Sequence, residues 1–252
     1  MEPGITLVVG VGEVGGALAK VLERKHRVTR LDLKPVTIDE PVEAMHICFP
    51  FTSPHQFEST VRGYIRRFSP RVTIINSTVL PGTTRNLTQA TGEPIVYSPV
   101  RGKHARMTIE LLNYTKFVSA VDPAWTETAR THFTVVGMKT RPVGAPETLE
   151  LAKLAETTYF GVIIAFAQEL ERYARATGAD YEEVTEFFEE VEFLPRVKYY
   201  PGFIGGHCVI PNINLLLQIA PAGLLEAALR SNELRAAETG PPVHQDRAIG
   251  EN

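Results

Sequence analysis

Residues 5–16 read Ile5-Thr6-Leu7-Val8-Val9-Gly10-Val11-Gly12-Glu13-Val14-Gly15-Gly16. The first five form a short β-branched run that is typical of a buried strand, and Ala17 to Leu22 predict a helix. Between them the glycines match G-x-G-x-x-G: the first permits a tight turn, the second lets a pyrophosphate approach the backbone, and the third lets the helix pack on the strand. The free N–H groups of the helix N-terminus favour phosphate there. The stretch therefore predicts a dinucleotide site made by Gly10, Val11, Gly12, Glu13, Val14 and Gly15.

An acidic residue follows at the spacing expected for a dinucleotide site. A second strand is predicted at residues 27–33, and it ends near Asp32. A carboxylate at this offset accepts a hydrogen bond from a ribose 2′-hydroxyl and repels a 2′-phosphate, so NAD is favoured over NADP. Lys34, beside this acid, is included among the expected cofactor contacts.

The pattern of strand and helix continues through the first half of the chain. Further strands are predicted at residues 44–49, 72–76, 94–99, 116–121 and 133–137, with a helix over 56–68 and Thr83 as a helix N-cap. Such alternation indicates βαβ units and a mostly parallel sheet. Ligands bind at the carboxyl ends of parallel strands, so the loops there are expected to contact the cofactor. These loops carry Phe49, Pro50, Phe51, Ser77 and Thr78.

The second half of the chain predicts helices. From Glu147 to Thr177 there is no proline and a single glycine, and apolar residues recur at helical spacing, which predicts one long helix. Lys153 and Thr157 lie one turn apart on one face of it, although an isolated lysine is ordinarily solvated. Further helices are predicted at 181–191 and 224–235. The fold class is therefore α/β: a Rossmann-like, mostly parallel sheet domain over 1–140, a helical domain over 141–239, and a disordered tail over 240–252.

A run rich in proline and glycine interrupts the helical half. It reads Tyr200-Pro201-Gly202-Phe203-Ile204-Gly205-Gly206-His207-Cys208-Val209-Ile210-Pro211-Asn212. Such a run is expected in neither the interior of a helix nor a central strand, so we predict a loop. Because glycines let a backbone approach a ligand closely, Cys208 is a candidate nucleophile. The alternative is a cysteine that acts only as a small buried apolar side chain.

Composition limits the classes of partner. The chain has 252 residues and a formal net charge of -3, so no general basic field favours nucleic acid. Cys48 and Cys208 make no disulfide framework, which indicates a reducing compartment. Neither a secretory signal nor an apolar run of the ~20 residues that span a bilayer is visible, and the expected location is cytoplasmic. No metal site is expected.

Four motifs in this order resemble the UDP-glucose/GDP-mannose dehydrogenase family. They are the glycine fingerprint, residues 77–84 with Ser77-Thr78-Val79 and Pro81-Gly82-Thr83-Thr84, residues 153–159 beginning at Lys153, and Gly205-Gly206-His207-Cys208. Residues 224–235 also resemble the helix that follows the family's central domain. Together they cover nearly the whole chain.

The resemblance implies NAD-dependent oxidation of the C6 alcohol of a sugar, with nucleotide-sugar substrates and two NAD molecules per turnover. It implies that Cys208 attacks the intermediate aldehyde and that water hydrolyses the resulting thioester. Lys153 would stabilise the oxyanion, and Thr78 would hold a water or contact the nicotinamide. Tyr200, Phe203, Gly205, Gly206 and His207 are expected to contact the substrate.

The chain departs from the family at several polar positions. Val100 and His104 stand where the family commonly has acids, Thr157 where it has asparagine, and Asn212 where it has aspartate. Ile204 is an extra residue in the cysteine loop, and the family's C-terminal nucleotide-binding domain is expected to be lacking. His104 is a candidate replacement base, because a neutral imidazole can activate water.

Two other functions remain open from the sequence. One is a one-step NAD-dependent dehydrogenase of a smaller hydroxy substrate, in which Cys208 is only structural. The other is a non-catalytic NAD-binding or assembly subunit. The long apolar helix also suggests a homodimer built through the helical domain.

Overall fold

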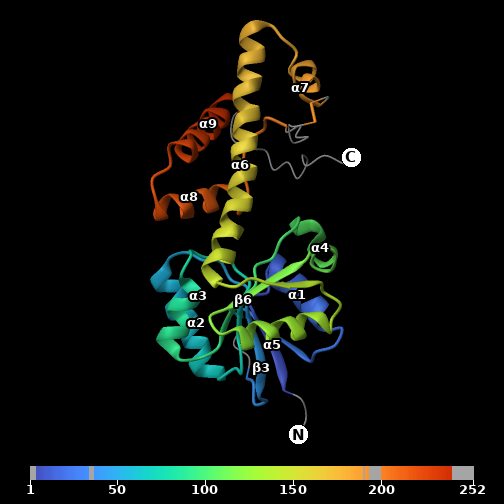
Figure 1. Ribbon diagram of the computed structural model, residues 1–252, viewed down its shortest axis with the longest axis vertical. Helices are drawn as coiled ribbons and strands as arrows, with labels where there is room; N and C mark the ends of the chain where they lie inside the picture. The colour runs from blue at the N-terminus through green and yellow to red at the C-terminus, as the bar shows by residue number, and fades with distance from the viewer. Residues whose placement is uncertain (1–3, 34–36, 190, 193–199, 240–252) are drawn as a thin grey trace. The chain divides into compact units, whose positions relative to one another are not determined.

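The computed structural model describes residues 4–33, 37–189, 191–192 and 200–239 (Figure 1). Lys34 and the expected tail at 240–252 lie outside these residues. The chain divides into two compact units, Met1–Lys153 and Leu154–Asn252. Each unit is described by itself below.

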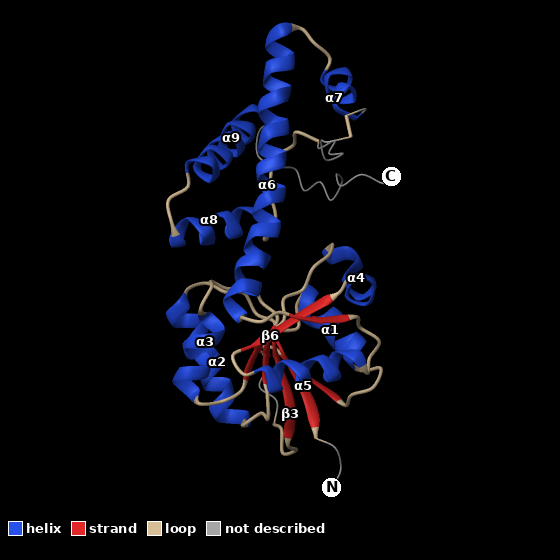
Figure 2. Cartoon of the chain, in the orientation of Figure 1, coloured by secondary structure: helices blue, strands red, loops and turns tan. Residues whose placement is uncertain are grey.

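The first unit is built on a seven-stranded sheet with the order β2-β1-β3-β4-β5-β6-β7 (Figure 2). Neighbouring strands are parallel except β5 and β6, which are antiparallel, so the predicted mostly parallel sheet is confirmed. The strand order reverses direction at β1, between β2 and β3, and a crevice at the carboxyl ends of such strands is where ligands bind. The strands are β1 (Ile5–Val9), β2 (Val28–Leu31), β3 (Val42–Ile47), β4 (Thr73–Ile75), β5 (Ile95–Tyr97), β6 (Lys116–Ala120) and β7 (Thr140–Pro142).

Helices cover both faces of the sheet, as Figure 1 shows, and this explains why its strands are apolar on both sides. Residues of α1 (Glu13–Leu22), α4 (Met107–Asn113) and α5 (Pro123–Thr134) share one core cluster with Val8, Ile74 and Val118. Residues of α2 (Pro54–Phe68) and α3 (Thr83–Thr91) share the other with Leu7, Met45 and Ile75.

Two local predictions in this unit are wrong. Residues 133–137 do not form the last strand, because α5 begins at Pro123 with Asp122 as its N-cap and continues to Thr134. Pro123 at the first position favours that start, and the strand lies later, at β7. Thr83 is not the N-cap of α3: Gly82, with a φ of 96°, takes that position, and the Thr83 hydroxyl donates to the Leu80 carbonyl.

The second unit is helical. The predicted long helix is confirmed as α6 (Pro146–Thr177), which begins within the residues of the first unit and is followed by α7 (Tyr181–Glu189), α8 (Val209–Ile219) and α9 (Gly223–Thr239). The run 200–212 is not a loop throughout, because Val209 to Asn212 form the start of α8. Pro211 is tolerated there because N–H groups in a first helical turn have no partner within the helix. Ile204, Val209 and Ile213 form the buried centre of this unit's own core cluster.

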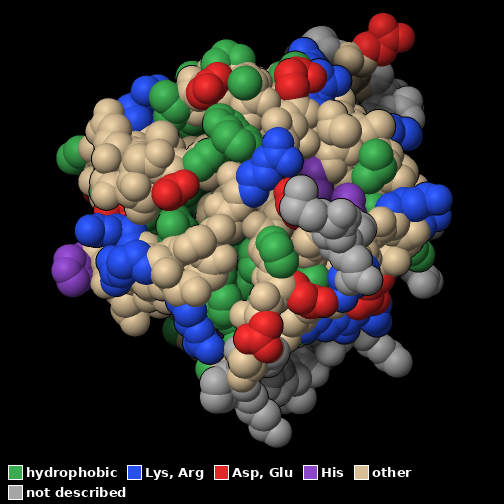
Figure 3. Space-filling view, turned by 90° about the horizontal axis from the view of Figure 1, so that it is seen from below, with side chains coloured by type: hydrophobic (Ala, Val, Ile, Leu, Met, Phe, Trp, Pro, Cys, Tyr) green, Lys and Arg blue, Asp and Glu red, His purple; other side chains and the backbone are tan. Residues whose placement is uncertain are grey.

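The surface carries charges of both signs. On the face shown in Figure 3, Lys and Arg side chains are interspersed with Asp and Glu side chains. No helix within the described residues combines the length and the apolar character needed to cross a membrane.

Candidate functional site

The glycine-rich turn after β1 has the geometry that its motif predicts. Gly10 has a φ of 86°, which favours glycine, and a Cβ on it would lie 2.9 Å from the Phe49 nitrogen. A Cβ on Gly15 would lie 1.8 Å from the Gly10 carbonyl oxygen, so only glycine lets α1 pack this closely. A Cβ on Gly12 would contact nothing within 4 Å. The backbone at Gly12, the N-cap of α1, is thus open to a ligand.

A cavity of about 400 Å³ adjoins this turn. Its lining combines the turn and the first residues of α1 with the segment around the start of α4, and Lys20 and Arg106 contribute positive charge. Open backbone, a helix N-terminus and two basic side chains fit the phosphates of a dinucleotide such as NAD. The lining residues are Gly12, Glu13, Gly16, Ala17, Lys20, Ala105, Arg106, Met107, Thr108 and Ile109.

Other expected cofactor contacts lie at the carboxyl ends of the neighbouring strands. Asp32 is exposed directly after β2. The Ser77 hydroxyl donates to the Phe49 carbonyl at 2.6 Å, so the loops after β3 and β4 are joined. Phe49 and Phe51 both pack on Phe57, while Pro50 is exposed and Thr78 half-buried. The structure therefore brings Gly10, Phe49 and Ser77 to one edge of the sheet.

Lys116, which no sequence motif indicated, is a buried lysine at the start of β6. Lys116 Nζ donates to Asn76 Oδ1 at 3.1 Å and to the carbonyls of Ser98 and Pro99 at 2.6 and 3.1 Å. Burial lowers the pKa of Lys116 to about 7, the Cys48 thiol opposes that shift, and the positive charge of Lys153 adds to it. Burial raises the pKa of Cys48 to about 12, which agrees with a packing role for this thiol. Lys153 itself is half-buried on α6.

A chain of buried polar side chains leads away from Lys116. Because Asn76 accepts from Lys116 with Oδ1, its Nδ2 is the donor to His46 Nδ1, 3.3 Å away. His46 then carries its proton on Nε2, which donates to His132 Nε2 at 3.0 Å. Burial lowers the pKa of both imidazoles, that of His132 to about 3. Both rings are therefore neutral at pH 7.

The first turn of α6 is tied to α3 by two acids. Glu150, fully buried, accepts from the Gly82 nitrogen at 2.7 Å, the Thr84 nitrogen at 2.9 Å and the Thr84 hydroxyl at 2.6 Å. Burial raises the pKa of Glu150, and these hydrogen bonds oppose the rise. Glu147 accepts from Arg85 through both its oxygens. These contacts fix the start of the helix that carries Lys153.

In the second unit, Cys208 is the N-cap residue of α8 and is half-buried. Its carbonyl accepts from the Asn212 nitrogen at 3.1 Å. The expected substrate contacts in the preceding segment are exposed, and they are Tyr200, Phe203, Gly205, Gly206 and His207. A segment of this kind is accessible to a ligand.

The structure also brings together Thr157 on α6 and Asn212 on α8. Asn212 Nδ2 donates to Thr157 Oγ1 at 2.9 Å, and Asn212 is buried. The backbone of His104 belongs to the short 3-10 helix η1 (His104–Arg106), and its side chain lies outside what the structure describes. In the described part of the chain, no group of three or more His, Cys, Asp or Glu side chains is placed to hold a metal ion.

A mostly parallel sheet with a glycine-rich turn, followed by a helical unit built on one long helix, is the arrangement typical of dinucleotide-dependent dehydrogenases. Within that class, residues 147–234 match the model of the central domain of the UDP-glucose/GDP-mannose dehydrogenase family. This match covers α7, α8 and the segment with Cys208.

Similarity to known proteins supports this match. The chain is 32% identical to a UDP-N-acetyl-D-mannosamine dehydrogenase of Pyrococcus horikoshii over 174 residues, 64% of this chain and 41% of the relative. The solved structure of UDP-D-ManNAc dehydrogenase from Pyrococcus horikoshii superposes with a TM-score of 0.80 at 21% identity, covering 93% of this chain and 69% of that one. A Mycobacterium tuberculosis 3-hydroxyisobutyrate dehydrogenase superposes with a TM-score of 0.70 at 15% identity, covering 93% and 94%. At these identities the superpositions establish the fold.

The chain spans only part of the curated relatives that it matches. The aligned regions cover 33%, 41% and 58% of the length of three of them. The activity and substrates of those whole proteins are therefore treated as proposals below.

Proposed function

We propose that this protein is an NAD-dependent dehydrogenase of a sugar or nucleotide-sugar alcohol that uses Cys208 as nucleophile. The observation that carries the proposal is a cysteine at the N-terminus of α8, after an exposed glycine-rich segment, in a chain whose other unit has a glycine-rich turn open to a ligand. The match to the family's central domain adds nucleotide sugars as the substrate class.

The residues of the first unit would hold the cofactor. The turn Gly10 to Gly15 would bind the pyrophosphate, Asp32 a ribose hydroxyl, and the segments at Phe49–Phe51 and Ser77–Thr78 the nicotinamide half. NAD, when bound, supplies the hydride acceptor. The phosphate-binding role rests on the open backbone at Gly12 and on the cavity beside it.

The proposed chemistry proceeds through a covalent bond to Cys208. The substrate alcohol is first oxidised to an aldehyde. The Cys208 thiolate then adds to the carbonyl carbon, and Lys153 stabilises the negative oxygen that forms. Loss of a second hydride from this carbon, which a second NAD would accept, leaves a thioester, and water cleaves it to release a carboxylate and the free thiol. An anionic sulfur is favoured near a helix N-terminus, which is where Cys208 lies.

The polar pair Thr157 and Asn212 is proposed to act next to the nucleophile. Asn212 is one turn into α8 after Cys208, and its amide is oriented by the Thr157 hydroxyl. In this arrangement Asn212 contributes a neutral hydrogen-bonding group, so a separate base must activate the water. We assign that role to His104.

The test is a panel of UDP- and GDP-sugars incubated with NAD while NADH absorbance is followed. Wild-type protein should form NADH with at least one sugar, and mass spectrometry should find substrate attached to the peptide that contains Cys208. Cys208→Ser should stop carboxylate formation, and His104→Ala should slow thioester release. An absence of NADH across the panel would refute the proposal.

A one-step dehydrogenase of a smaller hydroxy substrate is the second candidate. Its support is the superposition on a 3-hydroxyisobutyrate dehydrogenase, of which this chain covers 94%. In that case Lys153 would assist a single oxidation and Cys208 would only fill space. Full activity of Cys208→Ser on a hydroxy acid would favour this candidate over the first.

A further inference from the structure

The segment before Cys208 is held through its backbone by an asparagine on α9. Asn232 Oδ1 accepts from the Ile204 nitrogen at 2.7 Å, and Asn232 Nδ2 donates to the Ile204 carbonyl at 3.1 Å. The backbone N–H and the backbone carbonyl of Ile204 are thus both hydrogen-bonded to the side chain of Asn232. Because Asn232 is buried, losing either bond would leave a polar group without water.

A second amide extends this contact to Gly202. Gln168, fully buried on α6, donates from Nε2 to the Gly202 carbonyl at 2.7 Å and to Asn232 Oδ1 at 3.2 Å. The Ser231 hydroxyl donates to Gln168 Oε1 at 3.1 Å. The orientation of both amides is therefore determined by their partners.

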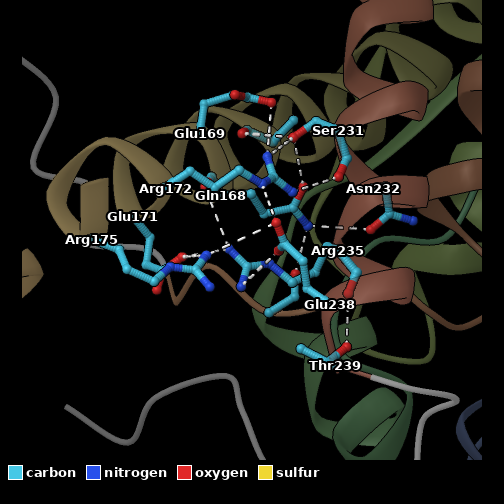
Figure 4. A network of polar contacts seen from close by, with 12 residues as sticks. Gln168, Glu169, Glu171, Arg172, Arg175, Ser231, Asn232, Arg235, Glu238 and Thr239 are labelled. Carbon is cyan, nitrogen blue, oxygen red and sulfur yellow. Dashed lines mark hydrogen bonds and ion pairs between the residues drawn. The ribbon is translucent and has the colours of Figure 1, made fainter.

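Ion pairs support this group of amides (Figure 4). Arg172 on α6 donates to the Ser231 hydroxyl and carbonyl at 3.0 and 2.9 Å and to Glu238 at 2.8 Å. Arg235, buried on α9, donates to Glu171 on α6 at 2.9 Å. These contacts hold α9 against α6 and limit the movement of Asn232.

Ile204 is also held by its side chain. It is buried in one cluster with Val209 and Ile213 of α8. A Cβ on Gly161 of α6 would lie only 2.6 Å from Val209 Cγ1, so α8 packs directly on α6 at this point. Between Ile204 and Val209, the residues before Cys208 are exposed, and Gly206 has a φ of 78°. The chain is thus held in place by buried contacts at Ile204 before Cys208 and at Val209 after it.

We propose that Asn232, assisted by Gln168, is a positioning residue for the Cys208 thiol. By fixing the Ile204 peptide it sets the start of a short exposed span whose other end is fixed by α8. Its importance for turnover rests on the proposed function, whereas its effect on the thiol does not. A residue that positions a nucleophile can change the rate by about 100-fold through a displacement of about 1 Å.

The experiment compares Asn232→Asp with Asn214→Asp. Asp at 232 keeps the acceptor for the Ile204 nitrogen but places a carboxylate oxygen against the Ile204 carbonyl. Asn214 is exposed on α8, so the same chemical change there is the matched control. The rate of iodoacetamide alkylation is measured from pH 6 to 10, with the modified peptide identified by mass spectrometry so that Cys48 is counted separately.

We expect a changed pH profile of Cys208 alkylation in Asn232→Asp and an unaltered profile in Asn214→Asp. Turnover, where a substrate is known, should show kcat lowered about 10- to 100-fold with an unchanged KM for NAD. Circular dichroism checks folding, and Asn232→Ser replaces Asn232→Asp if the latter does not fold. A lower melting temperature with an unchanged alkylation profile would overturn the proposal. If the wild-type protein oxidises no sugar, the proposed function fails while the alkylation result still decides the role of Asn232.

Discussion

Glu150 is a fully buried carboxylate whose partners are all at the start of α3. The substitution Glu150→Gln replaces one acceptor oxygen by an NH₂ group that faces N–H or O–H donors. The buried donors then lose a partner, and the free energy of unfolding should fall by about 2–4 kcal/mol. Urea unfolding followed by circular dichroism measures this change.

Glu147→Gln is the control on the same helical turn. Glu147 pairs with Arg85, and both side chains are about one-third or more exposed. A pair so open to solvent contributes less than about 1 kcal/mol. Equal losses for the two variants would contradict the role given to Glu150.

His46 and His132 are two buried histidines that should make the stability of the fold depend on pH. Their pKa values are lowered in the folded state, for His132 from 6.5 to about 3. At pH values between the folded and unfolded pKa, the unfolded state therefore binds protons that the folded state does not bind. Stability should therefore be unaffected above the unfolded pKa and be lost as pH falls from about 6.5 toward 3. The slope is about 1.4 kcal/mol per pH unit for each such histidine. The charges of Lys116 and His26 also lower the pKa of His46.

The measurement is urea unfolding at pH 7, 6, 5 and 4 for three proteins. His132→Gln keeps an acceptor for the His46 proton and removes one titrating group, so its stability should fall less steeply than that of the wild type. His55→Gln changes an exposed histidine of α2 and should behave like the wild type. If the free energy of unfolding of His132→Gln fell with pH as steeply as that of the wild type, His132 would not contribute to the loss of stability in acid.

At the residue scale, the sequence predicted those sites whose chemistry depends on local spacing. The roles of Gly10 and Gly15 follow from a motif, and their close contacts agree with it. Lys116, Glu150 and Asn232 gave no such signal, because each acquires its partners from residues distant in sequence. A single lysine or glutamate in an apolar segment does not reveal which carbonyl or N–H it will meet.

At the scale of elements, the packing of α8 on α6 depends on Gly161. A methyl group there would lie 2.6 Å from Val209 Cγ1 and 3.1 Å from Ile213 Cδ1. Gly161→Ala gains up to about 1 kcal/mol in helix propensity, but overpacking costs about 1–3 kcal/mol. We expect a net loss of stability, with Cys208 alkylation altered because Val209 must shift.

Gly63 in the middle of α2 provides the matched control. A Cβ at Gly63 would contact nothing within 4 Å, so Gly63→Ala should raise the melting temperature. The double variant Gly161→Ala/Val209→Ala should recover part of the loss by removing the clashing methyl group. A stabilised Gly161→Ala protein would contradict the close packing of the two helices.

Most elements were predictable because their apolar residues recur with one period. The long helix α6 and six of the strands followed from such patterns, and the strand that failed, 133–137, is the apolar end of α5. α8 was missed because its first turn contains a proline and follows three glycines. The interface of α9 could not be predicted from an apolar pattern, because three of its four buried residues are polar, namely Ser231, Asn232 and Arg235.

At the scale of the whole molecule, the two units differ in how completely their function could be inferred. The cradle of the first unit is defined by backbone geometry, which sequence motifs describe well. The second unit contributes one thiol and a set of polar side chains whose roles depend on long-range contacts, such as Asn212 with Thr157. The match to the family's central domain covers the helical half, and it supports the proposal that the glycine-rich turn and the thiol serve one reaction.

The long helix also carries a row of exposed aromatic side chains. Tyr159, Phe166 and Tyr173 of α6 recur every seven residues and are each more than half exposed, at 58%, 61% and 67%. A repeat of seven places them along one stripe of the helix. Since large exposed aromatic residues in a row are costly in water, we expect this stripe to be the contact of a homodimer.

Phe166→Glu tests this expectation. In a two-fold symmetric interface each substitution occurs twice, and burial of each phenylalanine contributes about 1.5–3 kcal/mol, so Phe166→Glu should convert a dimer to monomers. Phe187→Glu is the control, because Phe187 is an equally large side chain exposed on α7 rather than on the stripe. Sedimentation velocity at micromolar concentration measures the outcome. A wild-type protein that sediments as a monomer, or equal dissociation of both variants, would show that this face of α6 is not the dimer contact.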